Sequence, residues 1–440
     1  MSSSANVMDA AAAAALVRPT DTVGLPLGPG QPPSFLYALG ERDDWEDLRV
    51  YGALLAVGTE LFIRENVHLL SGFFGPIERM IRDAGGNIGF APADFRRFAP
   101  LYERQRPRVM CTVASAPDPD GWCSLSLHAG GSIRELLRAG EDPERLLVVE
   151  ASSAYPRTVG LPPKYPHRIN VDQVDVLIET DAAPLELPTM EATEVDRAIA
   201  GHAATFIESG CTVQTGIGAV PSVIATILAE GDYSDLGIHS EMFTDGLMRL
   251  HESGAVSNDK GVFDGLSVTT FAFGSKELYS WLDGNEEVAF LPVEVVNSPE
   301  VIASNRRMIS INGALGVDVH GQVVADTIAA RQFSGIGGHE DFAAGSGLQL
   351  EDRSLLCLPS TVTINGRLRS RIVPYFDRGA VITTPRHQVD VIVTEHGAAE
   401  LEGKTVHQRG MELARICHPD FRAEMEEAAE RASRGEAPFI

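Results

Sequence analysis

The strongest constraint on the fold is a repeat inside the chain itself. Residues 28–48 recur without a gap as residues 216–236, so that every matching pair is separated by 188 positions. A register kept over roughly twenty positions indicates that the chain contains two copies of one structural unit. The matching residues are Gly28, Gly30, Pro33, Ser34, Asp47 and Leu48 in the first copy, and Gly216, Gly218, Pro221, Ser222, Asp235 and Leu236 in the second.

A second echo extends the repeat toward the end of each copy. Gln173–Val176 returns as Gln388–Val391, now at a separation of 215, so the second copy is the longer one. A Pro-rich and acidic stretch, Thr180–Glu194, reads as the connection between the copies. We therefore predict two similar domains, 1–190 and 191–440, with a cleft between them as the natural ligand site.

Local patterns predict the class of each domain. Short β-branched runs alternate with helical patterns and glycine-rich turns. This alternation is typical of α/β domains built on mainly parallel sheets. The clearest predicted strands are Leu146–Glu150, Val174–Ile178 and Val389–Thr394, and the clearest predicted helices are Phe74–Ala84, Ser222–Glu230 and Arg422–Ala432.

Charge and cysteine content limit the partners and the compartment. Acidic residues outnumber basic ones by 61 to 36, and a chain this negative repels phosphate backbones, so we expect no nucleic-acid partner. The five cysteines are scattered and form no Cys-x-x-Cys pair, which favours a reducing, cytoplasmic location. No apolar stretch approaches the roughly 20 residues needed to cross a bilayer, so no membrane role is expected. The Ala10–Ala15 run predicts a helix behind an Asp9 cap rather than a signal peptide.

The two copies differ at one position that matters chemically. Ala53 in the first copy corresponds to Glu241 in the second, next to a predicted strand end at Leu236–His239. Symmetric packing cannot require a carboxylate where the twin position carries alanine. Two interpretations follow: a surface glutamate stabilised near a helix N-terminus, or a carboxylate kept for function.

Two glycine-rich loops are candidate anion sites. Thr215–Ser222 follows an apolar run and opens a helix, where glycines allow close approach and the first amides point outward. Ser334–Phe342 holds three glycines in four residues, a pattern that permits a nest of N–H donors, and Asp341 is the predicted helix cap that follows. The alternative for the first loop is a tight strand-to-helix turn, and for the second a flexible turn.

Other common chemistries find no support in the motifs. The first loop lacks the third glycine of a dinucleotide fingerprint, and no Gly-Lys-Ser/Thr follows it, which disfavours NAD and ATP sites. There is no His-Glu-x-x-His for a zinc hydrolase and no Gly-x-Ser-x-Gly for a serine hydrolase. Asp118–Gly121 is a predicted β-turn and not a calcium loop. We therefore expect no metal site.

A series of longer motifs follows a recognisable order along the chain. The motifs are Gly216–Ala219, Leu236–Met242, Gly274–Tyr279, Ser310–Leu315, Ser334–Phe342, Arg371–Pro374, Thr383–Arg386 and Val393–Gly397, with weaker matches at Asp120–Leu125 and Pro156–Thr158. In this order they resemble the acetyl-CoA hydrolase/transferase family, whose members include 4-hydroxybutyrate and butyrate:acetate CoA-transferases. The resemblance covers nearly the whole chain, from about Asp21 to Phe421, and is strongest in the second half.

The resemblance implies two related α/β domains of CoA-transferase type and a double displacement. Glu241 would attack the acyl-CoA carbonyl to give an acyl-glutamyl anhydride, and the released CoA thiolate would convert it to a glutamyl-CoA thioester. An incoming carboxylate then repeats these steps in reverse. The backbone amides of Gly337 and Gly338 suit the tetrahedral oxyanions, and Asn312 is a candidate side-chain donor.

The same resemblance implies where coenzyme A binds. The implied binding residues are Gly216, Ile217, Gly218, Ala219 and Val220 of the first loop, Ser334, and an arginine within Arg367–Arg371, with Arg369 and Arg371 as candidates. Acyl-CoA and a small carboxylate are then the substrates, no cofactor is tightly bound, and a homo-oligomer is expected.

Two alternative functions stay open on the sequence. An acyl-CoA hydrolase on the same scaffold would let water reach the glutamyl intermediate. A non-catalytic CoA-binding subunit would not need Glu241, and the presence of Glu241 beside both glycine loops argues against it.

Overall fold

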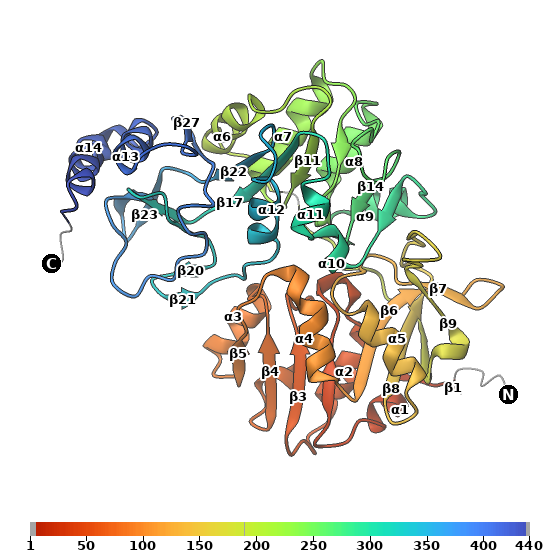
Figure 1. Cartoon of the computed structure of the whole chain (residues 1–440). Coiled ribbons are helices and arrows are strands. Elements are labelled where there is room, and N and C mark those ends of the chain that lie inside the picture. Colours follow the sequence, from red (N-terminus) through yellow and green to blue (C-terminus); the bar gives the residue numbers. More distant parts are fainter. Residues whose placement is uncertain (1–5, 189, 437–440) are drawn as a thin grey trace. The chain divides into compact units, whose positions relative to one another are not determined.

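A computed structural model describes residues 6–188 and 190–436, which form two compact units (Figure 1). Unit 1 holds the residues up to Pro188 together with two later segments, Glu241–Phe243 and Leu266–Asn297, and unit 2 holds the rest. The units therefore do not coincide with the expected continuous domains 1–190 and 191–440. The first break falls beside the expected boundary, but the chain later returns to unit 1 twice because strands in these segments pair with residues of that unit.

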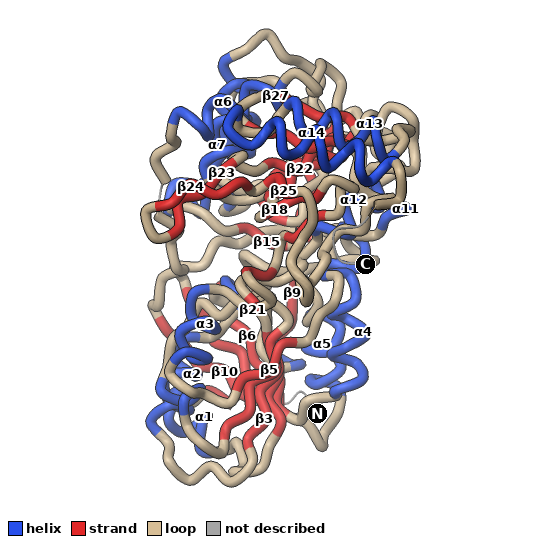
Figure 2. The backbone as a smooth tube through the Cα atoms, turned by 90° about the vertical axis from the view of Figure 1, so that its left-hand side faces the viewer, coloured by secondary structure: helices blue, strands red, loops and turns tan. Residues whose placement is uncertain are grey.

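Unit 1 is built on one eight-stranded sheet in which every neighbouring pair is parallel. Helices cover both faces of this sheet, with α1, α2 and α3 on one face and α4 and α5 on the other (Figure 2). Burial on both faces explains why the central strands are continuous apolar runs. In sheet order the strands are β1 (Asn6–Val7), β10 (Val176–Thr180), β8 (Leu146–Ser152), β6 (Val109–Ser115), β2 (Thr22–Gly24), β3 (Leu48–Gly52), β4 (Val67–Ser71) and β5 (Ile88–Phe90).

The helices of unit 1 begin where the sequence offers a start signal. Asp9 Oδ1 accepts the Ala12 amide at 2.7 Å and caps the first helix, as predicted. Proline occupies an early position of the second and third helices, where its missing N–H leaves no donor unsatisfied. The helices are α1 (Ala10–Ala15), α2 (Pro33–Glu41), α3 (Pro76–Asp83), α4 (Phe98–Gln105) and α5 (Ile133–Glu141).

Unit 2 is built on a six-stranded sheet, parallel except for its antiparallel edge strand β27. In sheet order the strands are β12 (Gly237–Ile238), β11 (Thr212–Thr215), β17 (Met308–Gly313), β22 (Arg353–Cys357), β26 (Val391–Thr394) and β27 (Gly397–Glu400). Its helices are α6 (Glu194–Ala204), α7 (Ala219–Glu230), α8 (Asp245–Glu252), α11 (Pro299–Ile302), α12 (His339–Gly345), α13 (Val406–Arg415) and α14 (Pro419–Ser433).

The repeat read from the sequence has a structural counterpart. The order β10-β8-β6-β2-β3 in unit 1 matches β26-β22-β17-β11-β12 in unit 2. The glycine loop and the following helix connect equivalent strands in the two units, β2 to β3 and β11 to β12. The α/β class and the mainly parallel sheets are thereby confirmed.

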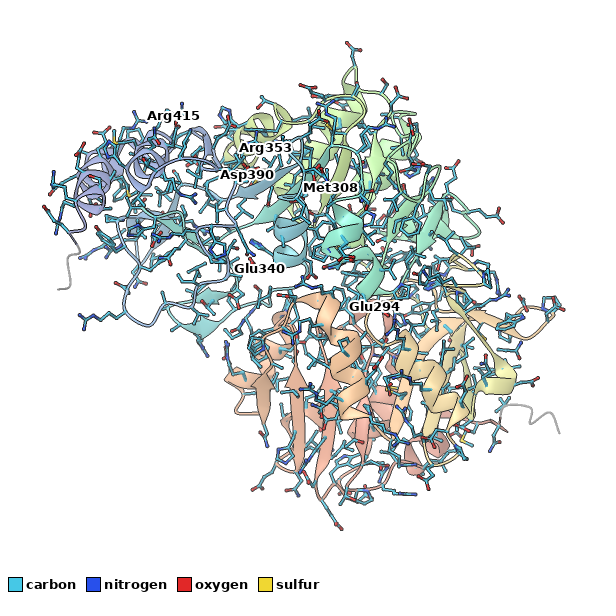
Figure 3. All side chains as sticks on the ribbon, in the orientation of Figure 1. Glu294, Met308, Glu340, Arg353, Asp390 and Arg415 are labelled. Carbon is cyan, nitrogen blue, oxygen red and sulfur yellow. The ribbon has the colours of Figure 1, made fainter. Side chains whose placement is uncertain are left out.

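The second echo marks equivalent aspartates at the start of equivalent strands. Asp175 Oδ2 accepts the Leu147 amide at 2.8 Å, and Asp390 Oδ2 accepts the Ser354 amide at 3.0 Å. Asp390 also binds the guanidinium of Arg353 at 2.9 Å, a pair that Figure 3 labels. Each aspartate therefore ties the start of its own strand to the neighbouring strand.

Short elements complete both units. The segments that return to unit 1 carry β13 (Met242–Phe243), β14 (Ser267–Thr269), β15 (Phe271–Ala272), α9 (Lys276–Leu282), β16 (Val288–Phe290) and α10 (Val293–Val296). The other small strands are β7 (Trp122–Ser124), β9 (Arg168–Asn170), β18 (Gly316–Asp318), β19 (Val323–Val324), β20 (Thr327–Ile328), β21 (Arg331–Gln332), β23 (Thr361–Ile364), β24 (Arg367–Ser370) and β25 (Ile372–Val373). Across the described residues, no helix combines the length and apolar composition that spanning a bilayer requires.

Candidate active site

Glu241 lies at a bend between β12 and β13, and its main chain is held firmly. Its carbonyl oxygen accepts hydrogen bonds from the amides of Thr270 at 3.0 Å and Phe271 at 3.3 Å. The Thr269 hydroxyl donates to the same oxygen at 3.0 Å. All four residues belong to unit 1, so the backbone of Glu241 is anchored to the second returning segment.

The carboxylate of Glu241 has a side-chain donor in the same unit. Asn297 Nδ2 donates to Glu241 Oε2 at 2.7 Å. Asn297 is fully buried and follows α10, and its own main-chain amide donates to the Val293 carbonyl at 2.8 Å. A short, charge-assisted hydrogen bond from a buried amide fixes the orientation of this carboxylate.

An apolar cluster lies under this segment. β13 pairs in parallel with β15, and Met242 and Phe271 belong to one cluster with aromatic side chains of the N-terminal part of unit 1. Phe95 meets Phe271 edge to face, with ring centroids 6.2 Å apart. The twin residue Ala53, which follows β3, is a member of this same cluster. Glu241 is therefore a polar group beside apolar packing.

The loop Gly216–Val220 runs from the end of β11 into the first turn of α7 in unit 2 and is partly open to solvent, with Ile217 54% exposed. Gly218 is the N-cap of α7 at φ +120°, a backbone angle that favours glycine. The helix α7 begins at Ala219, so Pro221 is its third residue. Among the described side chains, none accepts a hydrogen bond from the amides of Ala219 or Val220, so this helix N-terminus is uncapped.

The corresponding loop of unit 1 is closed by a carboxylate. Glu150, fully buried at β8, accepts the Ser34 amide and the Phe35 amide at 3.2 Å each, and the Ser34 hydroxyl at 2.7 Å. These donors form the first turn of α2, so a side chain of the protein itself occupies the anion position. Burial raises the pKa of Glu150, and the Ser34 and Phe35 donors oppose this.

The second glycine loop leads into α12. Gly338 is the N-cap of this helix and Gly337 adopts φ +55°, so the predicted cap at Asp341 is wrong; Asp341 lies in the first turn. Before the glycines, the amide of Ser334 donates to the Asp326 carbonyl at 3.0 Å. After them, His339 Nε2 lies 2.7 Å from the Thr384 hydroxyl. The loop is thus fixed at both ends.

Asn312 lies near the end of β17, the neighbour of β11. Its Nδ2 donates to Gln214 Oε1 at 3.3 Å, and the same oxygen accepts the Ile311 amide at 3.1 Å. Gln214 is the second-last residue of β11, and the glycine loop follows Thr215. The structure therefore brings Asn312 and the first glycine loop to the same end of the unit 2 sheet.

The two candidate arginines differ in their surroundings. Arg369 lies on β24 of an exposed hairpin, opposite Val362 of β23. Arg371 follows the hairpin and is partly buried, and its main-chain amide donates to the Ser360 carbonyl at 2.8 Å. Burial lowers the pKa of Arg371, and the nearby charge of Glu395 opposes that effect.

The predicted site residues thus fall into two groups. Glu241 belongs to unit 1 and is joined there by Asn297, while the glycine loops, Asn312, Ser334 and the arginines belong to unit 2. Within residues 6–188 and 190–436, no three His, Cys, Asp or Glu side chains gather in a way that could hold a metal ion.

Comparison with known proteins assigns the family. A sequence profile of the acetyl-CoA hydrolase/transferase C-terminal domain matches residues 274–429. The 4-hydroxybutyrate coenzyme A transferase of Clostridium kluyveri is 36% identical over 78% of this chain and 77% of its own length. The succinyl-CoA:cyclohexane-1-carboxylate CoA transferase of Geobacter metallireducens is 33% identical over 96% of this chain and 94% of its own. The chain belongs to the acetyl-CoA hydrolase/transferase family.

Other similarities agree with this family assignment. An acetyl-CoA hydrolase of Eremothecium gossypii is 28% identical over 89% of this chain and 78% of its own. Among solved structures, RipA from Yersinia pestis has a TM-score of 0.89 at 30% identity, and a 4-hydroxybutyrate CoA-transferase from Porphyromonas gingivalis has a TM-score of 0.78 at 29% identity. Each covers 97% of both chains, so the likeness in fold extends over nearly the whole molecule.

The sequence analysis missed Asn297, the side-chain donor to the carboxylate of Glu241. Asn297 precedes Ser298-Pro299, and an asparagine in such a position is typical of an ordinary helix end. The sequence distance of 56 residues from Glu241 gives no local signal that the two side chains meet. Only the return of Leu266–Asn297 to unit 1 brings them together.

Proposed function

We propose that this enzyme is a CoA-transferase that moves CoA between an acyl-CoA and a small carboxylate, with Glu241 as the nucleophile. The observation that carries the proposal is the placement of Glu241. A carboxylate whose orientation is fixed by a buried amide occupies the position at which the duplicated unit has the packed alanine Ala53. Fixing a nucleophile before the substrate arrives lowers the entropic part of the barrier.

The proposed chemistry gives a role to each predicted catalytic residue. The carboxylate of Glu241 attacks the thioester carbon, and the CoA thiolate leaves with the electron pair of the C–S bond. The amides of Gly337 and Gly338 and the side chain of Asn312 are the proposed donors to the tetrahedral oxyanions. Preorganised donors of this kind contribute most to the rate where charge develops in the transition state.

The proposed CoA-binding loop is Gly216–Val220. The uncapped N-terminus of α7 presents main-chain donors at the positive end of a twelve-residue helix, a position that suits a phosphate. Arg369 and Arg371 are the proposed partners for further CoA phosphates, and Ser334 is placed with the CoA-binding residues. No tightly bound cofactor enters the scheme.

A hydrolase is the second candidate, favoured by the 28% identity to an acetyl-CoA hydrolase. The two reactions share the glutamyl intermediate and differ in whether water or a carboxylate consumes it.

We also propose that the protein is a homo-oligomer in the cytoplasm. The five buried cysteines suit a reducing compartment. Light scattering of the purified protein tests the assembly.

The decisive experiment traps the intermediate. We expect intact-mass analysis after incubation with acetyl-CoA to show a CoA-sized adduct on Glu241, which borohydride removes. Adding acetate or butyrate while thiol release is followed separates transfer from hydrolysis. Full activity of a Glu241→Gln variant, with no adduct on the wild-type enzyme, would rule out the proposal.

A further inference from the structure

We propose that Thr383 and Thr384 are positioning residues that fix the second glycine loop, Gly335–Gly338, for catalysis. This inference rests on the proposed function, because it concerns the loop whose amides are the proposed oxyanion donors. It gives a role to the motif Thr383–Arg386, which has no other part in the proposed chemistry. The observation that motivates it is that the side chains of two consecutive residues bind the two opposite ends of this loop.

The main chain of the two threonines is itself held in place. Thr384 forms an antiparallel bridge with Val323 of β19, whose amide donates to the Thr384 carbonyl at 3.0 Å. The Val323 carbonyl accepts the amides of Thr383 and Thr384 at 2.9 and 3.1 Å. Pro385 follows, and a proline favours extended conformations of the residue before it. Neighbouring side chains of an extended segment point to opposite sides, so the two hydroxyls reach different parts of unit 2.

The hydroxyl of Thr383 binds the segment that leads into the loop. It donates to Asp326 Oδ1 at 2.6 Å and accepts the Ala325 amide at 2.8 Å. The main-chain carbonyl of Asp326 accepts the amides of Phe333 and Ser334 at 2.9 and 3.0 Å. Because Asp326 is buried, these hydrogen bonds lie in a low-dielectric environment, where each is stronger than in water. Thr383 is therefore connected through one buried aspartate to Ser334, the residue before the first glycine.

The hydroxyl of Thr384 binds the segment that leaves the loop. It donates at 2.6 Å to Oε1 of Glu340, which Figure 3 labels, and His339 Nε2 lies 2.7 Å from the same hydroxyl oxygen. Because the one proton of the hydroxyl goes to the carboxylate, His339 donates through Nε2. Burial keeps this imidazole neutral by lowering the pKa of His339 to about 4. Thr384 is fully buried, so it holds the first turn of α12 from inside unit 2.

The loop thus runs between two ends that consecutive residues hold. Its glycines allow many backbone conformations, and Gly337 adopts φ +55°, so the loop does not fix itself. Threonine is β-branched and has few χ1 rotamers, so each hydroxyl stays in position. An oxyanion donor acts only when it is aimed in advance at the developing charge, and a displacement of about 1 Å can cost on the order of 100-fold in rate. The two threonines therefore act on the transition state through the loop.

The first test replaces each threonine by valine, which keeps the β-branched shape and removes the hydroxyl. We expect kcat to fall by about 10-fold or more in Thr383→Val and in Thr384→Val. KM for acyl-CoA should change by less than about 2-fold, because the loop acts on the transition state and not on the bound substrate. Thr383→Ser and Thr384→Ser keep the hydroxyl and should hold kcat within about 3-fold of the wild type.

The matched control is Thr394→Val, which removes another buried threonine hydroxyl of unit 2. Thr394 Oγ1 donates to the Ile416 carbonyl at 2.7 Å and accepts the His396 amide at 3.1 Å. We expect this variant to lose stability in urea unfolding and to keep the kcat of the wild type per folded molecule. A purely structural role for Thr383 and Thr384 would give the same result in their valine variants.

A further variant covers the case in which neither valine variant folds. Gln332 is partly exposed, and its Nε2 donates to Asp326 Oδ2 at 2.9 Å and to the Ser334 carbonyl at 2.8 Å. Gln332→Met removes both hydrogen bonds from the end of the loop that Thr383 holds. We expect kcat to fall by about 3-fold or more with little change in KM. An unchanged kcat in this variant would then overturn the inference.

The rate at which the Glu241 adduct forms in a single turnover with acetyl-CoA separates this inference from the proposed function. Slower adduct formation in the valine variants than in the wild type supports the role of the threonines. If the valine variants form the adduct at the wild-type rate with unchanged kcat, that role is overturned and the transferase mechanism stands. If the wild type forms no adduct and Glu241→Gln keeps full activity, both fail.

Discussion

The glycine loops of the two units occupy equivalent places in the duplicated fold but have opposite surroundings. In unit 1 the loop at Gly28–Gly30 is buried, and Glu150 occupies the N-terminus of α2. In unit 2 the loop at Gly216–Val220 is partly exposed and α7 has no capping side chain. Strand register makes Cys357 of β22 the counterpart of Glu150 of β8.

This difference indicates that the two copies of the duplicated fold have different roles. The first copy fills the N-terminus of its helix with its own carboxylate, whereas in the second copy we propose that this position binds a phosphate of CoA. The same division holds at the strand that follows, where unit 1 has the packed Ala53 and the later copy has Glu241. Under the proposed function, stability and chemistry are concentrated in different copies, and the following predictions test that proposal.

The largest expected effect comes from making the two copies alike at Glu241. Glu241→Ala should lower kcat by at least about 10⁴-fold, because the nucleophile is lost. The fold should lose only about 1 kcal/mol, for the unmet donor of Asn297. Turnover and urea unfolding measure the two effects, with the exposed Glu252→Ala as the control. A loss of several kcal/mol in the free energy of unfolding of Glu241→Ala would contradict a purely chemical role for Glu241.

The second prediction transplants the carboxylate of unit 1 into unit 2. Cys357→Glu should place a carboxylate at the first turn of α7 and weaken CoA binding by about 100-fold, because an internal anion competes with the phosphate. Isothermal titration with CoA checks this, and Cys357→Ser serves as the control. Unchanged CoA affinity in a folded Cys357→Glu protein would show that the phosphates bind elsewhere.

The third prediction removes the carboxylate from unit 1. Glu150→Ala should lower the free energy of unfolding by about 2 kcal/mol, because the amides of Ser34 and Phe35 lose their buried acceptor. Affinity for CoA should not change. Urea unfolding and CoA titration on the same preparation give the free energy of unfolding and the CoA affinity. A change in CoA affinity without a change in stability would contradict a purely structural role for Glu150.

The last prediction concerns stability in acid. Burial lowers the pKa of His128 to about 3, and of His167 and His339 to about 4. The unfolded chain takes up these protons near pH 6.5, so stability is full above that value and falls as the pH drops toward 4. Each histidine contributes about 1.4 kcal/mol per pH unit in this window.

Unit 1 holds two of these histidines and unit 2 holds one, so unit 1 should be the more acid-sensitive. His128→Gln should reduce the loss of stability between pH 6.5 and pH 4, whereas the exposed His68→Gln should not. Unfolding free energies at several pH values check the slope. An unchanged slope in His128→Gln would mean that this side chain takes up its proton without unfolding.

Much of the fold could be predicted because it repeats. The constant separation located the glycine loop and α2 of the first copy and the equivalent glycine loop and α7 of the second. The Gln-Val-Asp-Val echo located β10 and β26, where an aspartate accepts a main-chain amide of the neighbouring strand. Local patterns with a clear period also located α3, α14 and β8, each within three residues of the predicted ends.

The parts that could not be predicted depend on long-range packing. Nothing in the local pattern of Leu266–Asn297 indicates that it packs with unit 1, since short strands such as β13 and β15 have too few residues to show a period. The start of α12 was misplaced because Gly338 caps it through backbone geometry and not through a side chain. The alanine at the twin position drew attention to Glu241, and the family resemblance gave Glu241 its expected role. Asn297 has no comparable asymmetry to reveal it.

The return of Leu266–Asn297 to unit 1 has a consequence for biosynthesis. A growing chain emerges from the ribosome in order, and the first unit of most duplicated proteins completes its fold before the second is made. Here unit 1 stays incomplete until residue 297 has emerged, after the whole first βαβ element of unit 2. Glu241, the proposed nucleophile, therefore gains its hydrogen-bond donor Asn297 only after residue 297 has been synthesised.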